Sequence, residues 1–165
     1  MTSGIRTPPP GAHSSRGGAD LRWMLTRLVE EVPGVLSVAV VSADGLPLLS
    51  SGPERSLPAT GRAAGPMGAA ADLATVVSGL GSLTVGAATL MEGGRVRQTL
   101  VAMDTGNLLV MSISDGSLLG VHTAPTADMG VVTYHMALFV GRAGHLLTPE
   151  LRAELRQSVP HGAFG

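Results

Sequence analysis

The sequence contains no cysteine and no lysine, and aromatic residues make up only 2% of its 165 residues. Without cysteine, disulfides, thiolate metal sites and cysteine nucleophiles are excluded. Without lysine, the phosphate-binding loop of nucleotide hydrolases, which needs a lysine after its glycines, is excluded as well. Because 44% of the residues are hydrophobic and few of these are aromatic, the core must be built from small aliphatic side chains. We therefore expect a tightly layered domain with little internal space.

Charge and hydropathy exclude two further classes of partner. The chain has eleven basic and twelve acidic residues, and its basic residues form no cluster that could neutralise a row of phosphates. A nucleic-acid partner is therefore not expected. No segment offers about 18 uninterrupted apolar residues, and the N-terminus lacks the apolar core of a secretory signal. We expect a cytoplasmic protein without membrane insertion.

The chain length fits one domain with tails. Residues 1–18 are mostly proline, glycine and serine and are predicted to be a disordered tail, because they bury too little apolar surface to offset the entropy of ordering. One domain is expected over residues 19–147. Residues 148–165 are expected to form a short helix, with Pro149 at its first helical position, and a loose C-terminal tail.

The domain is predicted to begin with a helix and two strands. Asp20 is the expected cap of the helix and Pro33-Gly34 ends it. The apolar residues of the helix share one face: Leu21, Leu25, Leu28, Val29 and Val32. Residues 35–43 are predicted to be a strand covered on both sides, and residues 46–51 a strand near the sheet edge, because Pro47 cannot donate a ladder hydrogen bond.

Asp44-Gly45 separates these two strands. We interpret it as a two-residue type I′ hairpin turn with Asp44 as its first central residue, so the carboxylate is exposed because the turn is. Asp104 and Asp115 also follow strands and lie close before a glycine, which is typical of tight turns. None of the three aspartates is expected to be catalytic.

The rest of the domain is predicted as a loop over 52–65, a long helix over 66–91, three strands and a last helix opening at Pro125-Thr126. The strands cover residues 95–103, 107–113 and 117–123 and are joined by short hairpins. The fold class is therefore α/β: an α/β/α sandwich around a five-stranded antiparallel sheet, in the order α-β-β-α-β-β-β-α. Gly79, Gly81 and Gly86 each cost up to about 1 kcal/mol in a helix, so close approach of a second helix or of the sheet is expected there.

No arrangement of residues indicates catalysis, a cofactor or a metal ion. No serine lies in a G-x-S-x-G elbow. His122, His135 and His145 are too far apart for a helical ligand pair, and His135 is interpreted as a helix-face residue. We therefore predict no catalytic, cofactor-binding or metal-binding residues.

The strand over 95–103 carries polar groups where a covered strand would carry valines. Arg95, Arg97 and Thr99 alternate with Val96, Gln98 and Leu100. Two interpretations remain open: a charged edge strand that resists aggregation, or an edge that pairs with its own copy in a symmetric dimer.

Three stretches resemble the roadblock, or dynein light chain 7, domain family, in particular its bacterial, actinobacterial members. They are WMLTRLVEEVPGVLSVAVVSADGLPL, GRVRQTLVAMDTGNLLVMSISDGSLLGV and ADMGVVTYHMALFV. The predicted element order is that of the family, whose fold is roadblock or profilin-like. The resemblance covers residues 21–147.

This resemblance implies a non-enzymatic homodimeric adaptor that binds a Ras-like small GTPase in bacterial signal transduction. It also implies that some members stimulate GTP hydrolysis and that a sensor-kinase-like protein is encoded nearby. The family dimer joins its third strands and packs its long helices together. Carried over to this sequence, the expected dimer or partner interface consists of Leu73, Val77, Leu80, Thr84, Arg95, Arg97, Thr99 and Leu100.

A small-molecule sensor domain of PAS-like or GAF-like type is the alternative function. Similar layers of helix and sheet enclose ligands in those modules. The scarcity of aromatic side chains speaks against it, because ligand pockets draw on aromatic and large residues.

Overall fold

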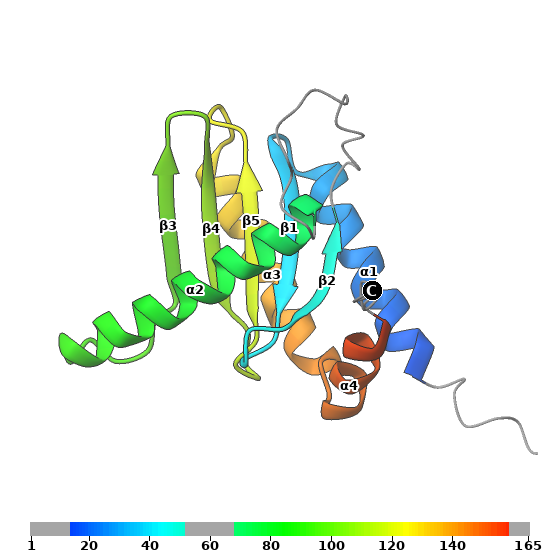
Figure 1. Cartoon of the computed structure of the whole chain (residues 1–165). Helices are drawn as coiled ribbons and strands as arrows, with labels where there is room; N and C mark the ends of the chain where they lie inside the picture. Colours follow the sequence, from blue (N-terminus) through cyan, green and yellow to red (C-terminus); the bar gives the residue numbers. More distant parts are fainter. Residues whose placement is uncertain (1–13, 52–67, 159–165) are drawn as a thin grey trace, which may run out of the picture.

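Five strands form one antiparallel sheet in the computed structural model, which describes residues 14–51 and 68–158 (Figure 1). The elements along the chain are α1 (Ser14–Glu31), β1 (Val35–Val41), β2 (Pro47–Ser51), α2 (Gly68–Leu90), β3 (Gln98–Met103), β4 (Gly106–Ser112), β5 (Leu118–Thr123), α3 (Met129–Leu146) and α4 (Pro149–Ser158). The strands lie in the order β2-β1-β5-β4-β3. The predicted fold class and element order are confirmed.

Helices cover both faces of the sheet. Helix α2 crosses one face, and α1 and α3 lie side by side on the other (Figure 1). The inner strands β1, β5 and β4 are buried on both sides for this reason: in β1, Val38 and Val40 face α1 and α3, while Val41 faces α2. Most of the core therefore lies between the sheet and α1, α3 and α4, and a smaller cluster lies under α2.

Helix α1 begins at Ser14, earlier than the predicted cap at Asp20. Residues 14–18, assigned by sequence to the disordered tail, are thus part of the helix, and residues 1–13 lie outside the described residues. Gly17 and Gly18 lie against the leucines of α4, and a Cβ at Gly17 would be 3.2 Å from Leu151 Cδ2. This tertiary contact overrides the low helix propensity of the two glycines.

The predicted type I′ turn at Asp44 is wrong. Gly45 N donates to Ser42 O (2.9 Å) and Ser42 N donates to Leu46 O (2.8 Å), which closes a three-residue loop. Only Gly45 has positive φ there (84°), so the loop is a turn followed by a glycine bulge. The β4–β5 connection repeats this geometry, because Gly116 (φ 90°) follows Asp115 in the same way.

Both turn aspartates hold helix α4. Asp44 Oδ1 lies 2.8 Å from Arg156 Nη2, and Asp115 Oδ2 lies 3.6 Å from Arg152 Nη1. The helix begins after Thr148, whose hydroxyl accepts a hydrogen bond from Leu151 N (3.2 Å). These polar contacts position α4 so that its buried leucines close one end of the core.

Replacing Asp44 with asparagine should cause a small loss of thermal stability at neutral pH. The hydrogen bond from Ser42 and, to a lesser degree, the charge of Arg156 hold the pKa of the Asp44 carboxyl below its ordinary value. A lowered folded-state pKa stabilises the fold above the ordinary pKa, and this stabilisation is lost as pH falls through the folded-state value. The difference between wild type and variant in thermal melts should therefore disappear at acidic pH.

Asp104→Asn is the matched control for this prediction, because it removes the same charge from the exposed β3–β4 turn. Asp104 makes no hydrogen bond or ion pair within the described ranges. A stability loss for Asp44→Asn that equals the control at every pH would contradict the assigned contacts.

Two element boundaries differ from the sequence prediction. Strand β3 begins at Gln98, so Arg95 and Arg97 precede it. Helix α3 begins at Met129 rather than at Pro125-Thr126, because Asp128 caps it by accepting hydrogen bonds from Gly130 N (2.9 Å) and Val131 N (3.2 Å). The predicted loop over 52–65 and the first two residues of the predicted long helix lie outside the described residues.

Candidate interaction surface

Helix α2 contacts the sheet through small residues. A Cβ on Gly120 of β5 would overlap with the Val77 side chain, and a Cβ on Gly81 would overlap with Leu118. Glycine at these two positions therefore lets the helix lie directly on β1 and β5. This close approach supplies the packing reason expected for Gly81. Gly79 and Gly86 are different, because a Cβ at either would have no neighbour within 4 Å.

A stripe of exposed residues runs along the side of α2 that faces away from β1 and β5. Its members alternate between large and small side chains at spacings of three and four residues: Val76, Gly79, Leu83, Gly86 and Leu90. We call this stripe the α2 seam. Leu83 is 72% exposed and Leu90 87% exposed. A repeat of three and four is the pattern by which one helix packs against another, and the glycines would admit large side chains of a partner.

Strand β3 forms the edge of the sheet next to this helix. Its side chains are mostly exposed, including Leu100 (50%) and Met103. In Figure 1 the C-terminal part of α2 projects past β3, beyond the edge of the sheet. The edge strand and the projecting helix thus leave adjacent apolar surface uncovered within one chain.

The helical residues predicted for the interface lie mainly toward the sheet. Val77 is fully buried and belongs to the core of the chain itself. Leu73 and Leu80 are half-buried and pack against the same cluster. The hydroxyl of Thr84 donates to Leu80 O (2.8 Å) within the helix. The helical residues predicted for the interface therefore lie mainly on the sheet-facing side of α2, whereas the α2 seam lies on its exposed side.

The strand residues predicted for the interface do not share one face. Thr99 pairs with Val110, whose side chain packs under α2, whereas Leu100 pairs with Leu109 on the opposite face. Arg95 and Arg97 are exposed and precede the strand, and Arg95 Nη2 reaches Ile113 O at 3.5 Å. Only Thr99 and Leu100 of these four residues belong to the edge strand itself.

Helix α2 is apolar enough to resemble a membrane-spanning helix. Its segment Leu73–Leu90 has the length and composition of a membrane span, although only 11% of that segment is buried in the chain. The segment qualifies by its mean hydropathy, although serines and threonines interrupt its apolar residues, so the prediction of no uninterrupted apolar run is not contradicted. The buried contacts of Ala74 and Val77 with the sheet make α2 part of the folded domain.

Within residues 14–51 and 68–158, no three histidine, aspartate or glutamate side chains come together in a way that could hold a metal ion. His135 lies on α3 in edge contact with Tyr134, with ring centroids 5.5 Å apart. The uncovered apolar surfaces of α2 and β3 are of the kind that marks sites of protein–protein contact.

Fold and surface together define a small α/β/α module with an open sheet edge. The chain belongs to the roadblock/LC7 domain family, whose model matches residues 21–123. This confirms the resemblance inferred from the sequence. No curated protein matches the chain.

Solved structures support the assignment. A roadblock/LC7 domain from Streptomyces avermitilis is 31% identical, with a TM-score of 0.64 over 77% of this chain and 98% of that chain. A second structure from this organism is 33% identical, with a TM-score of 0.53 over 74% and 96%. MglB from Myxococcus xanthus shares the fold at 14% identity, with a TM-score of 0.64 over 77% and 94%.

Proposed function

We propose that this protein is a non-enzymatic homodimeric adaptor that binds a Ras-like small GTPase in a bacterial signalling system. The family assignment supports the adaptor role, because the resemblance implies platforms for such GTPases. The same resemblance suggests a sensor-kinase-like protein as a further partner and stimulation of GTP hydrolysis as a further activity. The cytoplasm is the proposed location.

The α2 seam is the main observation that supports a homodimer. Two copies related by a twofold axis would place the same stripe opposite itself, so that the leucines of one helix meet the glycines of the other. The uncovered edge of β3 lies beside the seam, and pairing of two such edges would extend the sheet across the axis. A dimer thus covers the apolar part of α2 in water and accounts for its span-like composition without a membrane.

An adaptor with no catalytic residue can still accelerate a GTPase. Phosphoryl transfer depends chiefly on positioning and electrostatics, so a partner that orders the mobile residues of a GTPase is sufficient. Arg95 and Arg97 are exposed beside the edge strand. Arg97 is available to such a partner, whereas the Arg95 guanidinium also donates to Ile113 O (3.5 Å).

The GTPase proposal is tested by mixing the purified chain with the Ras-like GTPase encoded nearest to its gene. The GTPase is loaded either with GDP or with a non-hydrolysable GTP analogue, and association is measured by size-exclusion chromatography with light scattering. Hydrolysis of GTP is measured with and without the chain. We expect co-elution in one nucleotide state. The proposal fails if the two proteins associate in neither state and the hydrolysis rate is unchanged.

A further inference from the structure

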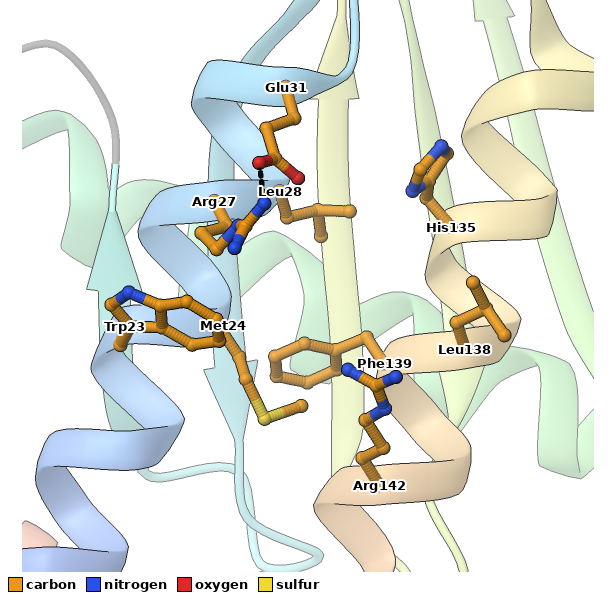
Figure 2. Close-up of a pocket in the computed structure, with 9 residues that line it drawn as sticks. All are labelled: Trp23, Met24, Arg27, Leu28, Glu31, His135, Leu138, Phe139 and Arg142. Atoms are coloured by element: carbon orange, nitrogen blue, oxygen red, sulfur yellow. Dashed lines mark hydrogen bonds and ion pairs between the residues drawn. The ribbon is translucent and has the colours of Figure 1, made fainter.

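A groove between α1 and α3 lies on the face of the sheet opposite to α2. Its volume is about 270 Å³. Trp23 and Arg27 line it from α1, Leu138 and Arg142 line it from α3, and the buried Phe139 lies at its base (Figure 2). Because the α2 seam is on the other face, dimerisation through the seam leaves this groove accessible.

The groove gathers side chains that are scarce in this protein. The chain has one tryptophan, and this residue, Trp23, lines the groove from α1 and is 55% exposed. The buried Phe139 lines it from α3. Tryptophan and arginine are among the residues most enriched where binding energy concentrates in protein interfaces. A large aromatic side chain left in water beside an apolar base therefore indicates a surface that a partner covers.

The charge of the groove indicates the chemistry of that partner. Arg27 stacks over Trp23, with 4.7 Å from the guanidinium carbon to the ring centroid, and forms an ion pair with Glu31. Arg142 makes no ion pair or hydrogen bond with any residue that the structure describes. Figure 2 shows its guanidinium beside Phe139, directed toward the groove. An unmatched arginine next to an apolar base favours a carboxylate that flanks apolar side chains.

The shape of the groove fits a helix. Two helices side by side on a sheet leave a furrow into which the ridge of a third helix packs. The α1 side of the groove, from Trp23 to Glu31, is about 12 Å long at the rise of an α-helix, which matches about two turns of a partner helix. We propose that the α1–α3 groove binds an acidic amphipathic helix of another protein, with its apolar residues over Phe139 and a carboxylate on Arg142. This site is independent of the proposed GTPase-binding role.

Trp23 provides a direct readout, because it is the only tryptophan of the chain. The probe is a synthetic helical peptide of leucines at helical spacing with glutamates on its flanks, without tryptophan. The matched control peptide carries lysine in place of every glutamate. The acidic peptide is titrated into the full chain at low salt, and we expect the wavelength and intensity of the Trp23 emission to change. The dissociation constant of the acidic peptide should be roughly tenfold lower than that of the lysine peptide.

Charge reversal at the groove should reverse this preference. Arg142→Glu is expected to weaken binding of the acidic peptide and to strengthen binding of the lysine peptide. Ala137 is exposed on another side of α3, so Ala137→Glu should change neither affinity. Circular dichroism of both variants verifies that the helices are intact. Loss of the preference only in Arg142→Glu supports the proposal.

Three results would overturn it. One is an unchanged Trp23 emission with the acidic peptide at concentrations up to about 1 mM. Another is equal affinity for both peptides, which would remove the role of Arg142. The third is a change in oligomeric mass caused by Leu138→Glu, because it would show that a second copy of the chain occupies the groove.

Discussion

Leu83→Asp should convert the dimer into a folded monomer of 16.7 kDa. Leu83 is 72% exposed in the single chain, so the fold of one chain loses little when its side chain becomes charged. In the proposed dimer the same position is buried against the second copy, and the twofold axis introduces the charge twice. Burial of an unpaired carboxylate costs several kcal/mol, on the order of 3 kcal/mol or more per copy. Dimer affinity should therefore fall by at least about a hundredfold.

Light scattering at micromolar concentration measures this change, and Ser82→Asp is its matched control. Ser82 is also exposed on α2, one residue away, but outside the α2 seam. Ser82→Asp should therefore leave the protein a dimer, with twice the mass of the chain. A wild-type protein that is monomeric under these conditions would remove the basis of the proposed dimer. Loss of the dimer in both variants would show that charge anywhere on α2 is disruptive and that the seam is not the contact.

The fold could be predicted from the sequence because its local signals agree. The valines of β1 form a short run bounded by Gly34 and the Asp44 turn, which indicates a strand covered on both faces. Residues Leu21 to Val32 repeat at helical spacing, which indicates one buried helix face. These patterns depend only on neighbours along the chain, and the structure reproduces the order of elements.

The type of the β1–β2 turn could not be predicted in the same way. An Asp-Gly pair fits a two-residue turn and also the end of a three-residue loop with a glycine bulge. The choice depends on whether Ser42 pairs with Leu46, and the Ser42 side chain contributes by hydrogen-bonding to Asp44. Contacts to Arg156 of α4, distant in sequence, then hold the turn.

The α2 seam was missed because α2 is apolar on nearly every side. Alanine, valine, leucine and glycine surround the helix, so periodicity does not show which side faces the sheet. The side that faces the sheet is determined by Gly120 of β5, because the absence of a side chain there makes room for Val77. From the sequence alone, alternation of Val76, Gly79 and Leu83 at spacings of three and four was the one available signal.

The contact of Val77 with Gly120 should couple the effects of substitutions at the two positions. Gly120→Ala places a methyl group where the Val77 side chain lies, and overpacking of this kind costs about 1–3 kcal/mol of unfolding free energy. Val77→Ala alone leaves a cavity at a fully buried position and should cost a similar amount, about 1–3 kcal/mol. In the double variant the new methyl group fills the space that Val77 leaves. The double variant should thus be more stable than the sum of the single losses by about 1 kcal/mol or more.

Urea unfolding of the two single variants and the double variant measures this coupling free energy. The pair of Gly120→Ala with Leu155→Ala is the control. Leu155 is buried on the other face of the sheet, so its loss should add to that of Gly120→Ala without coupling. Additivity in both pairs would contradict the close contact. Because Val77 fixes the rotation of α2 on the sheet, Gly120→Ala should also displace the α2 seam and weaken dimerisation. Leu155→Ala should lower stability while leaving the dimer affinity of the folded protein unchanged, which separates the effect of helix position from that of stability.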